Sequence, residues 1–60
     1  MKTISMQSKT VKGQTYNIMK LYAEYGETEN TFRKECEAYG REVVHFEQKG
    51  RIVDAIVHVA

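Results

Sequence analysis

Two Lys-Gly dipeptides, Lys12-Gly13 and Lys49-Gly50, constrain the fold of this chain more than any other feature. Glycine adopts positive φ without steric cost, so it is favoured in the two-residue loops of β-hairpins. The residues on both sides of each dipeptide are strand-like: the C-terminal ones are rich in β-branched side chains, and polar and apolar positions partly alternate. The sequence therefore predicts two β-hairpins, one in each half of the chain.

In the C-terminal hairpin, a loop at Lys49-Gly50 fixes which residues face one another across the strands. The pairs are Phe46 with Val53, Val44 with Ala55, and His45 with Asp54. One face then carries only apolar side chains, namely Val44, Phe46, Val53, Ala55, Val57 and Val59. The opposite side of the sheet, which we call the second face, is mixed and carries Val43, His45, Glu47, Ile52, Asp54, Ile56 and His58.

The residues of the N-terminal hairpin divide between two faces in the same way when Lys12-Gly13 forms its loop. The facing pairs are Met6 with Met19, Ile4 with Leu21, and Lys2 with Ala23. Its contribution to the second face is Thr3, Ser5, Gln7, Lys9, Tyr16, Ile18, Lys20 and Tyr22. Both hairpins thus divide into one apolar face and one mixed face, which supports these two registers.

Between the hairpins, residues 29–39 are predicted to form a helix. Thr28 or Asn30 can cap its first turn, and Gly40 suits the left-handed position just past its end. Three apolar residues at helical spacing, Phe32, Cys36 and Tyr39, can lie on the apolar sheet face. The predicted fold is therefore a single α+β domain over residues 1–60, with the order β-β-α-β-β and a four-stranded, mainly antiparallel sheet.

Residues 16–25 also allow a different fold. Ile18, Leu21, Tyr22 and Tyr25 match helical spacing, and two helices followed by the C-terminal hairpin would make a winged helix-turn-helix. Tyr22 is large for the close approach of two such helices, and acidic residues outnumber basic ones in the second helix. We therefore favour the strand and keep the winged helix-turn-helix as the alternative.

The small size of the chain points to a partner. A chain of 60 residues buries only about 60% of the surface that its unfolded form exposes, and association is a common remedy. A homodimer would cover the apolar and aromatic part of the second face. The candidate partner- or dimer-binding residues are Tyr16, Ile18, Tyr22, Val43, Ile52 and Ile56. Pairing through an edge strand is the alternative route.

A second hypothesis is nucleic-acid binding. Aromatic side chains interleaved with lysines on an open sheet can stack bases and hold the phosphate backbone. The candidate residues are Lys9, Tyr16, Lys20 and Tyr22. The net charge of the chain is only +1, whereas phosphate-driven binding depends on a stronger positive field. Protein binding is therefore favoured over nucleic-acid binding.

No residue pattern indicates catalysis. His45, Asp54 and His58 share a face, but no third catalytic or metal-ligating group has a fixed place beside them. Cys36 lies between Glu35 and Glu37, whose charges oppose thiolate formation, so we expect a buried core cysteine. We therefore expect no enzymatic activity, catalytic residue, metal, cofactor or small-molecule substrate.

No apolar run approaches the roughly 18 residues of a membrane span, and the lone cysteine suits a reducing compartment. We therefore expect a cytoplasmic protein without membrane association. The favoured function is a small non-enzymatic protein-binding module that inhibits, links or regulates a larger macromolecule, in keeping with the size of many phage and mobile-element proteins. The alternative is a small nucleic-acid-binding protein or transcription regulator.

Overall fold

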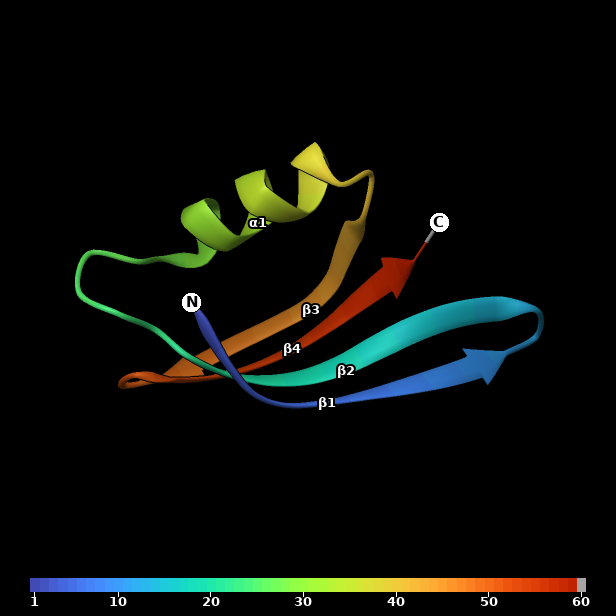
Figure 1. Cartoon of the computed structure of the whole chain (residues 1–60), viewed down its shortest axis with the longest axis horizontal. Coiled ribbons are helices and arrows are strands. Elements are labelled where there is room, and N and C mark those ends of the chain that lie inside the picture. The colour runs from blue at the N-terminus through green and yellow to red at the C-terminus, as the bar shows by residue number, and fades with distance from the viewer. Residues whose placement is uncertain (60) are drawn as a thin grey trace.

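The fold has the predicted order β-β-α-β-β. A computed structural model describes residues 1–59 and gives the elements β1 (Lys2–Val11), β2 (Gln14–Tyr22), α1 (Glu29–Ala38), β3 (Glu42–Lys49) and β4 (Ile52–Val59). The strands form one antiparallel sheet in the order β1-β2-β4-β3, and α1 lies across one of its faces (Figure 1). This confirms the α+β prediction and supplies the strand order, which the sequence left open.

The alternative of a helix over residues 16–25 is wrong. Residues 14–22 form β2, in which Asn17 and Leu21 are buried and Ile18 and Lys20 are exposed, as expected for a strand of period two. The main-chain N–H of Ala23 still donates to the carbonyl of Arg51, at 2.7 Å. The chain is therefore not a winged helix-turn-helix.

The loop of the N-terminal hairpin is the predicted one. Lys12 and Gly13 both have positive φ, 52° and 77°, as a type I′ turn requires. The pairing of Val11 with Gln14 through Ser5 with Lys20 follows the predicted register, with Met6 opposite Met19. The turn and the first seven residue pairs are therefore determined locally.

A β-bulge at Ile4 changes the register at the start of β1. Thr3 faces Leu21, and Lys2 faces Tyr22. The predicted pairs of Ile4 with Leu21 and of Lys2 with Ala23 are wrong, because a bulge inserts one unpaired residue into its strand. Thr3 consequently moves to the face that carries α1, and Lys2 moves to the second face.

The loop of the C-terminal hairpin lies one residue further along than predicted. Lys49 pairs with Ile52, so the loop is Gly50-Arg51, and Gly50 has φ of 62°. Glycine suits both the second position of a type I′ loop and the first position of a type II′ loop, so this signal alone did not fix the register. Phe46 therefore faces Ala55 instead of the predicted Val53.

A second bulge, at Val44, reverses the predicted faces at the start of β3. Val43 pairs with Val57 and is only 8% exposed, whereas Val44 is 46% exposed. The prediction that Val43 lies on the second face and Val44 on the apolar face is therefore wrong. The carbonyl of Val43 also accepts a hydrogen bond from Arg33 of α1, at 3.3 Å, so the helix contacts the backbone beside the bulge.

Both ends of α1 lie close to their predicted positions. Thr28 is the N-cap residue, and its N–H donates to Oγ1 of Thr31 at 3.4 Å. At the other end, the N–H of Gly40 donates to the carbonyl of Glu37, at 3.0 Å, and the N–H of Arg41 donates to the carbonyl of Cys36, at 2.9 Å. This pair of hydrogen bonds is the Schellman pattern. Tyr39 lies outside the helix and is 78% exposed, so its predicted place in the apolar stripe is wrong.

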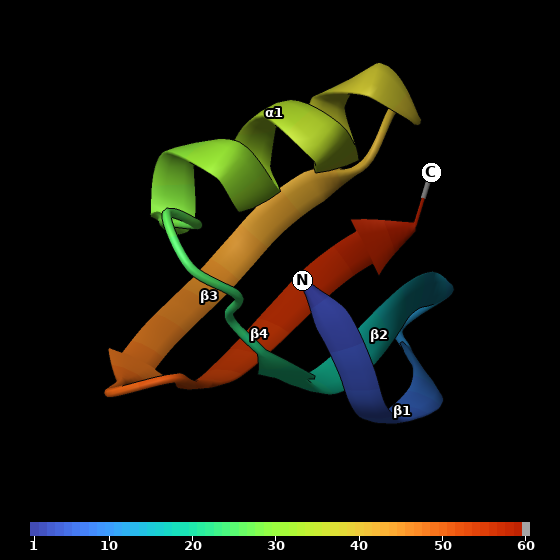
Figure 2. The same cartoon turned by 60° about the vertical axis from the view of Figure 1, so that its left-hand side comes forward.

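The core lies between α1 and the sheet. Phe32 and Cys36 of the helix are buried as predicted, and the rings of Phe32 and Phe46 are 5.8 Å apart. The helix covers mainly the β3 side of the sheet, away from the β1–β2 hairpin (Figure 2). The buried apolar residues are Leu21, Ala23, Phe32, Cys36, Val43, Val53, Ala55 and Val57.

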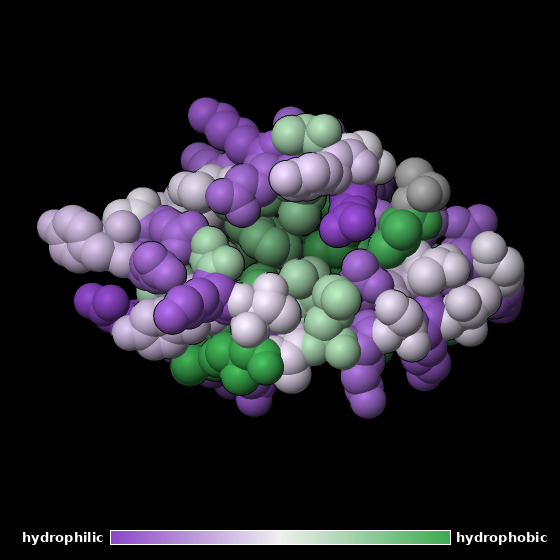
Figure 3. All heavy atoms as spheres, in the orientation of Figure 1, coloured by the Kyte–Doolittle hydropathy of each residue, from purple (hydrophilic) through white to green (hydrophobic). Residues whose placement is uncertain are grey.

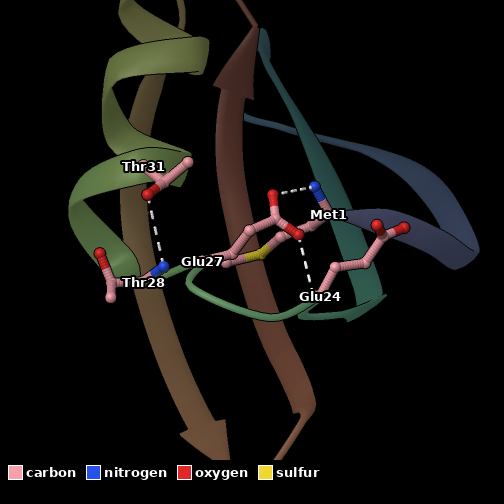
Figure 4. Close-up of polar contacts among 5 residues, drawn as sticks. All are labelled: Met1, Glu24, Glu27, Thr28 and Thr31. Carbon is pink, nitrogen blue, oxygen red and sulfur yellow. Dashed lines mark hydrogen bonds and ion pairs between the residues drawn. The ribbon is translucent and has the colours of Figure 1, made fainter.

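The loop before the helix is tied to the N-terminus (Figure 4). The Met1 ammonium donates to Oε2 of Glu27, at 2.5 Å, while Oε1 of Glu27 accepts the N–H of Glu24, at 2.8 Å. These hydrogen bonds lower the pKa of the Glu27 carboxyl, and the bond to Glu27 raises the pKa of the terminal amine. One carboxylate therefore links the start of β1 to the entry of α1.

This contact predicts that stability falls at both ends of the pH scale. The lowered pKa of Glu27 gives stability that is lost as pH falls below the usual carboxyl pKa and through the folded value. The raised pKa of the amine gives stability that is lost as pH rises above its usual value and through the folded one. Glu27→Gln should flatten both limbs in thermal unfolding measured across a pH series. A pH profile with the same shape as that of the unsubstituted chain would contradict this assignment.

Candidate functional site

The second face is built by strand alternation. On β2 and β4, the side chains that point away from α1 form four cross-strand pairs. These pairs are Tyr16 with His58, Ile18 with Ile56, Lys20 with Asp54, and Tyr22 with Ile52. The structure thus places five of the six candidate partner-binding residues on one surface. The sixth, Val43, is in the core, and the exposed Val44 takes its place on this face.

An apolar hollow marks the middle of this face. It has a volume of about 260 Å³ and is lined by Lys9, Tyr16, Ile18, Val44 and Ile56. Ile18 and Ile52 are each 39% exposed, which is high for β-branched apolar residues within a strand. The pair of Tyr22 with Ile52 lies on the same face, beyond the Lys20–Asp54 pair. Together with the hollow it makes up an apolar and aromatic patch, of the kind that marks contact surfaces.

The charges around this patch are divided between the two hairpins. Lysines occupy the side formed by β1 and β2, and most of the charges on the side formed by β3 and β4 are acidic. The basic half carries Lys2, Lys9 and Lys20, and the acidic half carries Glu42, Glu47 and Asp54. Two cations also lie on the acidic half: the ammonium of Lys49 is 3.3 Å from Glu47, and Arg51 of the β3–β4 loop contacts Tyr22. The second face is therefore electrically asymmetric although the whole chain is nearly neutral.

The candidate nucleic-acid-binding residues are also on this face. Lys9 pairs with Tyr16 across β1 and β2, and Lys20 lies two residues before Tyr22 on β2. Lys20 is flanked across the strands by Asp54, which partly offsets its charge. The phenol oxygen of Tyr22 accepts a hydrogen bond from Arg51, at 3.5 Å. The four residues share a face, and acidic residues share it with them.

The predicted pairing of His45 with Asp54 is wrong. The shifted loop places His45 opposite Ile56 and Asp54 opposite Glu47. Nε2 of His45 lies 3.9 Å from Oε2 of Glu47, and Nε2 of His58 lies 2.5 Å from Oε1 of Gln14. Among residues 1–59, no three His, Cys, Asp or Glu side chains gather as metal ligands would.

The only cysteine of the sequence is a core residue, as predicted. Cys36 is a free, buried thiol on α1, and burial raises its pKa. A raised pKa leaves the sulfur protonated and weakly nucleophilic. Cys36 therefore contributes to packing against the sheet.

A hollow on the helix side of the sheet was not indicated by the sequence. Figure 3 shows recessed apolar atoms between α1 and the β1–β2 hairpin. The hollow has a volume of about 150 Å³, and Glu35 and Arg41 are its charged lining residues. It arises because one helix of ten residues covers only part of a four-stranded sheet. Strand order and helix position decide this feature, and neither has a local sequence signal.

The part of the chain that the structure describes has no helix with the length and apolar character of a membrane span. No protein-family model matches the sequence, and searches of the curated proteins and of the solved structures found no significant match. The second face is therefore the feature from which a function can be inferred.

Proposed function

We propose that this chain is a small, non-enzymatic protein-binding module that contacts another protein chain through its second face and acts as an inhibitor, adaptor or regulator of a larger macromolecule. The apolar and aromatic patch around Ile18 and Ile56 is the observation that carries the proposal. Such a patch loses unfavourable contact with water when a complementary protein surface covers it. The free thiol of Cys36 supports a reducing compartment such as the cytoplasm.

Protein binding is favoured over nucleic-acid binding by the charges of the second face. Lys9 and Lys20 would attract a phosphate backbone, but Asp54 and Glu47 lie on the same surface and would repel it. A protein surface can match both signs of charge. We therefore expect no strong, salt-sensitive binding of single- or double-stranded oligonucleotides in fluorescence anisotropy.

The chain offers a matched pair of tyrosines for testing protein binding. Tyr22 belongs to the patch, whereas Tyr25 is 94% exposed in the loop after β2. In affinity capture from a lysate of the source cell, Tyr22→Ala should reduce the recovered protein about tenfold, within the usual range for an aromatic interface residue. Tyr25→Ala should leave recovery unchanged.

Two results would contradict the proposal. One is equal recovery with the unsubstituted chain and the Tyr22→Ala variant. The other is tight, salt-sensitive oligonucleotide binding that Lys9→Gln and Lys20→Gln abolish, which would favour the nucleic-acid-binding alternative.

A further inference from the structure

We infer that a second copy of this protein covers the second face. The two copies are related by a two-fold axis that lies between them, runs parallel to the strands and passes over the boundary between β2 and β4. The inference rests on the proposed function, because it names the protein that this face contacts. Two-fold contacts bring the same surface of both copies together, so that surface must complement itself. The division of charge between the hairpins meets this requirement.

The direction of the axis follows from the positions of the charges. A two-fold axis along the strands lays β1 and β2 of one copy over β3 and β4 of the other. The basic half of each copy then meets the acidic half of its partner. An in-plane axis across the strands would instead place lysines over lysines and carboxylates over carboxylates. Charge therefore selects one of the two face-to-face arrangements.

The cross-strand rows give the individual contacts. One row runs Lys9, Tyr16, His58, Glu42, and another runs Ser5, Lys20, Asp54, Glu47. Rotation about an axis along the strands does not change the position of a row along that axis. Each row therefore lies over the same row of the other copy, and Lys20 lies over Asp54 of the partner subunit. By the same operation, Lys9 lies over Glu42 of the partner subunit. Both oppositions occur twice in the dimer.

The apolar residues match under the same operation. Ile18 lies over Ile56 of the partner subunit, and Tyr22 lies over Ile52 of the partner subunit, so the patch is covered by its own copy. Like charges remain opposed at one end of the sheet, where Lys2 approaches Lys49 of the partner subunit and Arg51 adds a further positive charge. Within one chain Lys49 already contacts Glu47.

A dimer closed in this way leaves α1 and the helix-side hollow on the outside of the assembly. Those surfaces remain available to a larger macromolecule, and Tyr22→Ala would lower the recovery of such a partner by weakening the dimer that presents them. The dimer is therefore compatible with a regulatory role exercised through its outer surfaces.

Charge reversal on one half at a time tests the arrangement. Lys9→Glu with Lys20→Glu makes the second face mainly acidic, and Glu42→Lys with Asp54→Lys, at the two positions that oppose these lysines, makes it mainly basic. Each double variant alone should dimerise at least about 100-fold more weakly, because like charges then oppose one another. An equal mixture should restore the dimer, because each altered half now meets an oppositely charged half.

The measurement is sedimentation velocity over a concentration series, with one variant tagged so that the mixed dimer has its own mass. Circular dichroism shows that each variant is folded, and Lys9→Gln with Lys20→Gln replaces the first variant if it is not. Lys34→Glu, on the exposed side of α1, is the control and should not weaken the dimer.

The possible outcomes separate this inference from the proposed function. Loss of the dimer in each variant and its recovery in the mixture support the inference. A dimer that survives both double variants, or one that the mixture does not restore, overturns it. An unsubstituted chain that stays monomeric also overturns it, while a partner captured in a Tyr22-dependent manner would leave the proposed function standing.

Discussion

Phe32→Ala should leave the chain largely unfolded at room temperature. The Phe32 side chain is only 5% exposed, and its ring packs 5.8 Å from that of Phe46. Removing a buried phenylalanine costs about 3–5 kcal/mol, and a core of this size rarely supplies more than about 3–5 kcal/mol in total. The predicted loss therefore equals the whole stability of an isolated chain.

Urea unfolding followed by circular dichroism measures this effect. Tyr25→Ala is the matched control, because it removes an aromatic ring that is 94% exposed and should change stability by no more than about 0.5 kcal/mol. A Phe32→Ala variant that still unfolds cooperatively within about 1 kcal/mol of the unsubstituted chain would show that α1 does not hold this core together.

Val43→Asp and Val44→Asp should have opposite consequences although the two residues are neighbours. Val43 is 8% exposed beneath α1, so an aspartate there would bury a charge among the apolar side chains of the core. We expect Val43→Asp to prevent folding. Val44 is 46% exposed on the second face, so Val44→Asp should cost no more than about 1 kcal/mol of folding stability.

Comparing the two variants tests whether β3 has a bulge at Val44. Dilute samples prevent association between chains from contributing to the measured stability. Circular dichroism and thermal unfolding report the folded fraction of each variant. Equal losses, or a larger loss for Val44→Asp, would show that β3 runs without the bulge in the register predicted from the sequence.

Local signals were sufficient for the elements of the fold. Gly13 fixes the first hairpin because its neighbour Lys12 also adopts positive φ, and the two strands pair without interruption from Val11–Gln14 to Ser5–Lys20. The helix was predictable from Thr28 at its start and Gly40 past its end. These features depend on residues close in sequence, where backbone sterics and short hydrogen bonds dominate.

The faces of the strands were predictable only where the alternation is uninterrupted. Ile18 and Ile56 were placed together on the second face because β2 and β4 are regular. Val43 was misplaced because the run Val43-Val44-His45 contains no residue that marks a bulge. One inserted residue moves every side chain beyond it to the other face, so a local irregularity changes the composition of a surface.

By itself, the sequence determined two glycine-containing hairpins, a capped helix between them and an alternation that gives the sheet two unlike faces. Tertiary structure alone decided that β4 lies between β2 and β3, that Val43 packs beneath α1 and that most lysines of the second face lie on the half opposite its carboxylates. The first group follows from the backbone preferences of neighbouring residues. The second depends on which strands pair at long range and on where the helix makes its contacts, and neither is encoded in any single segment.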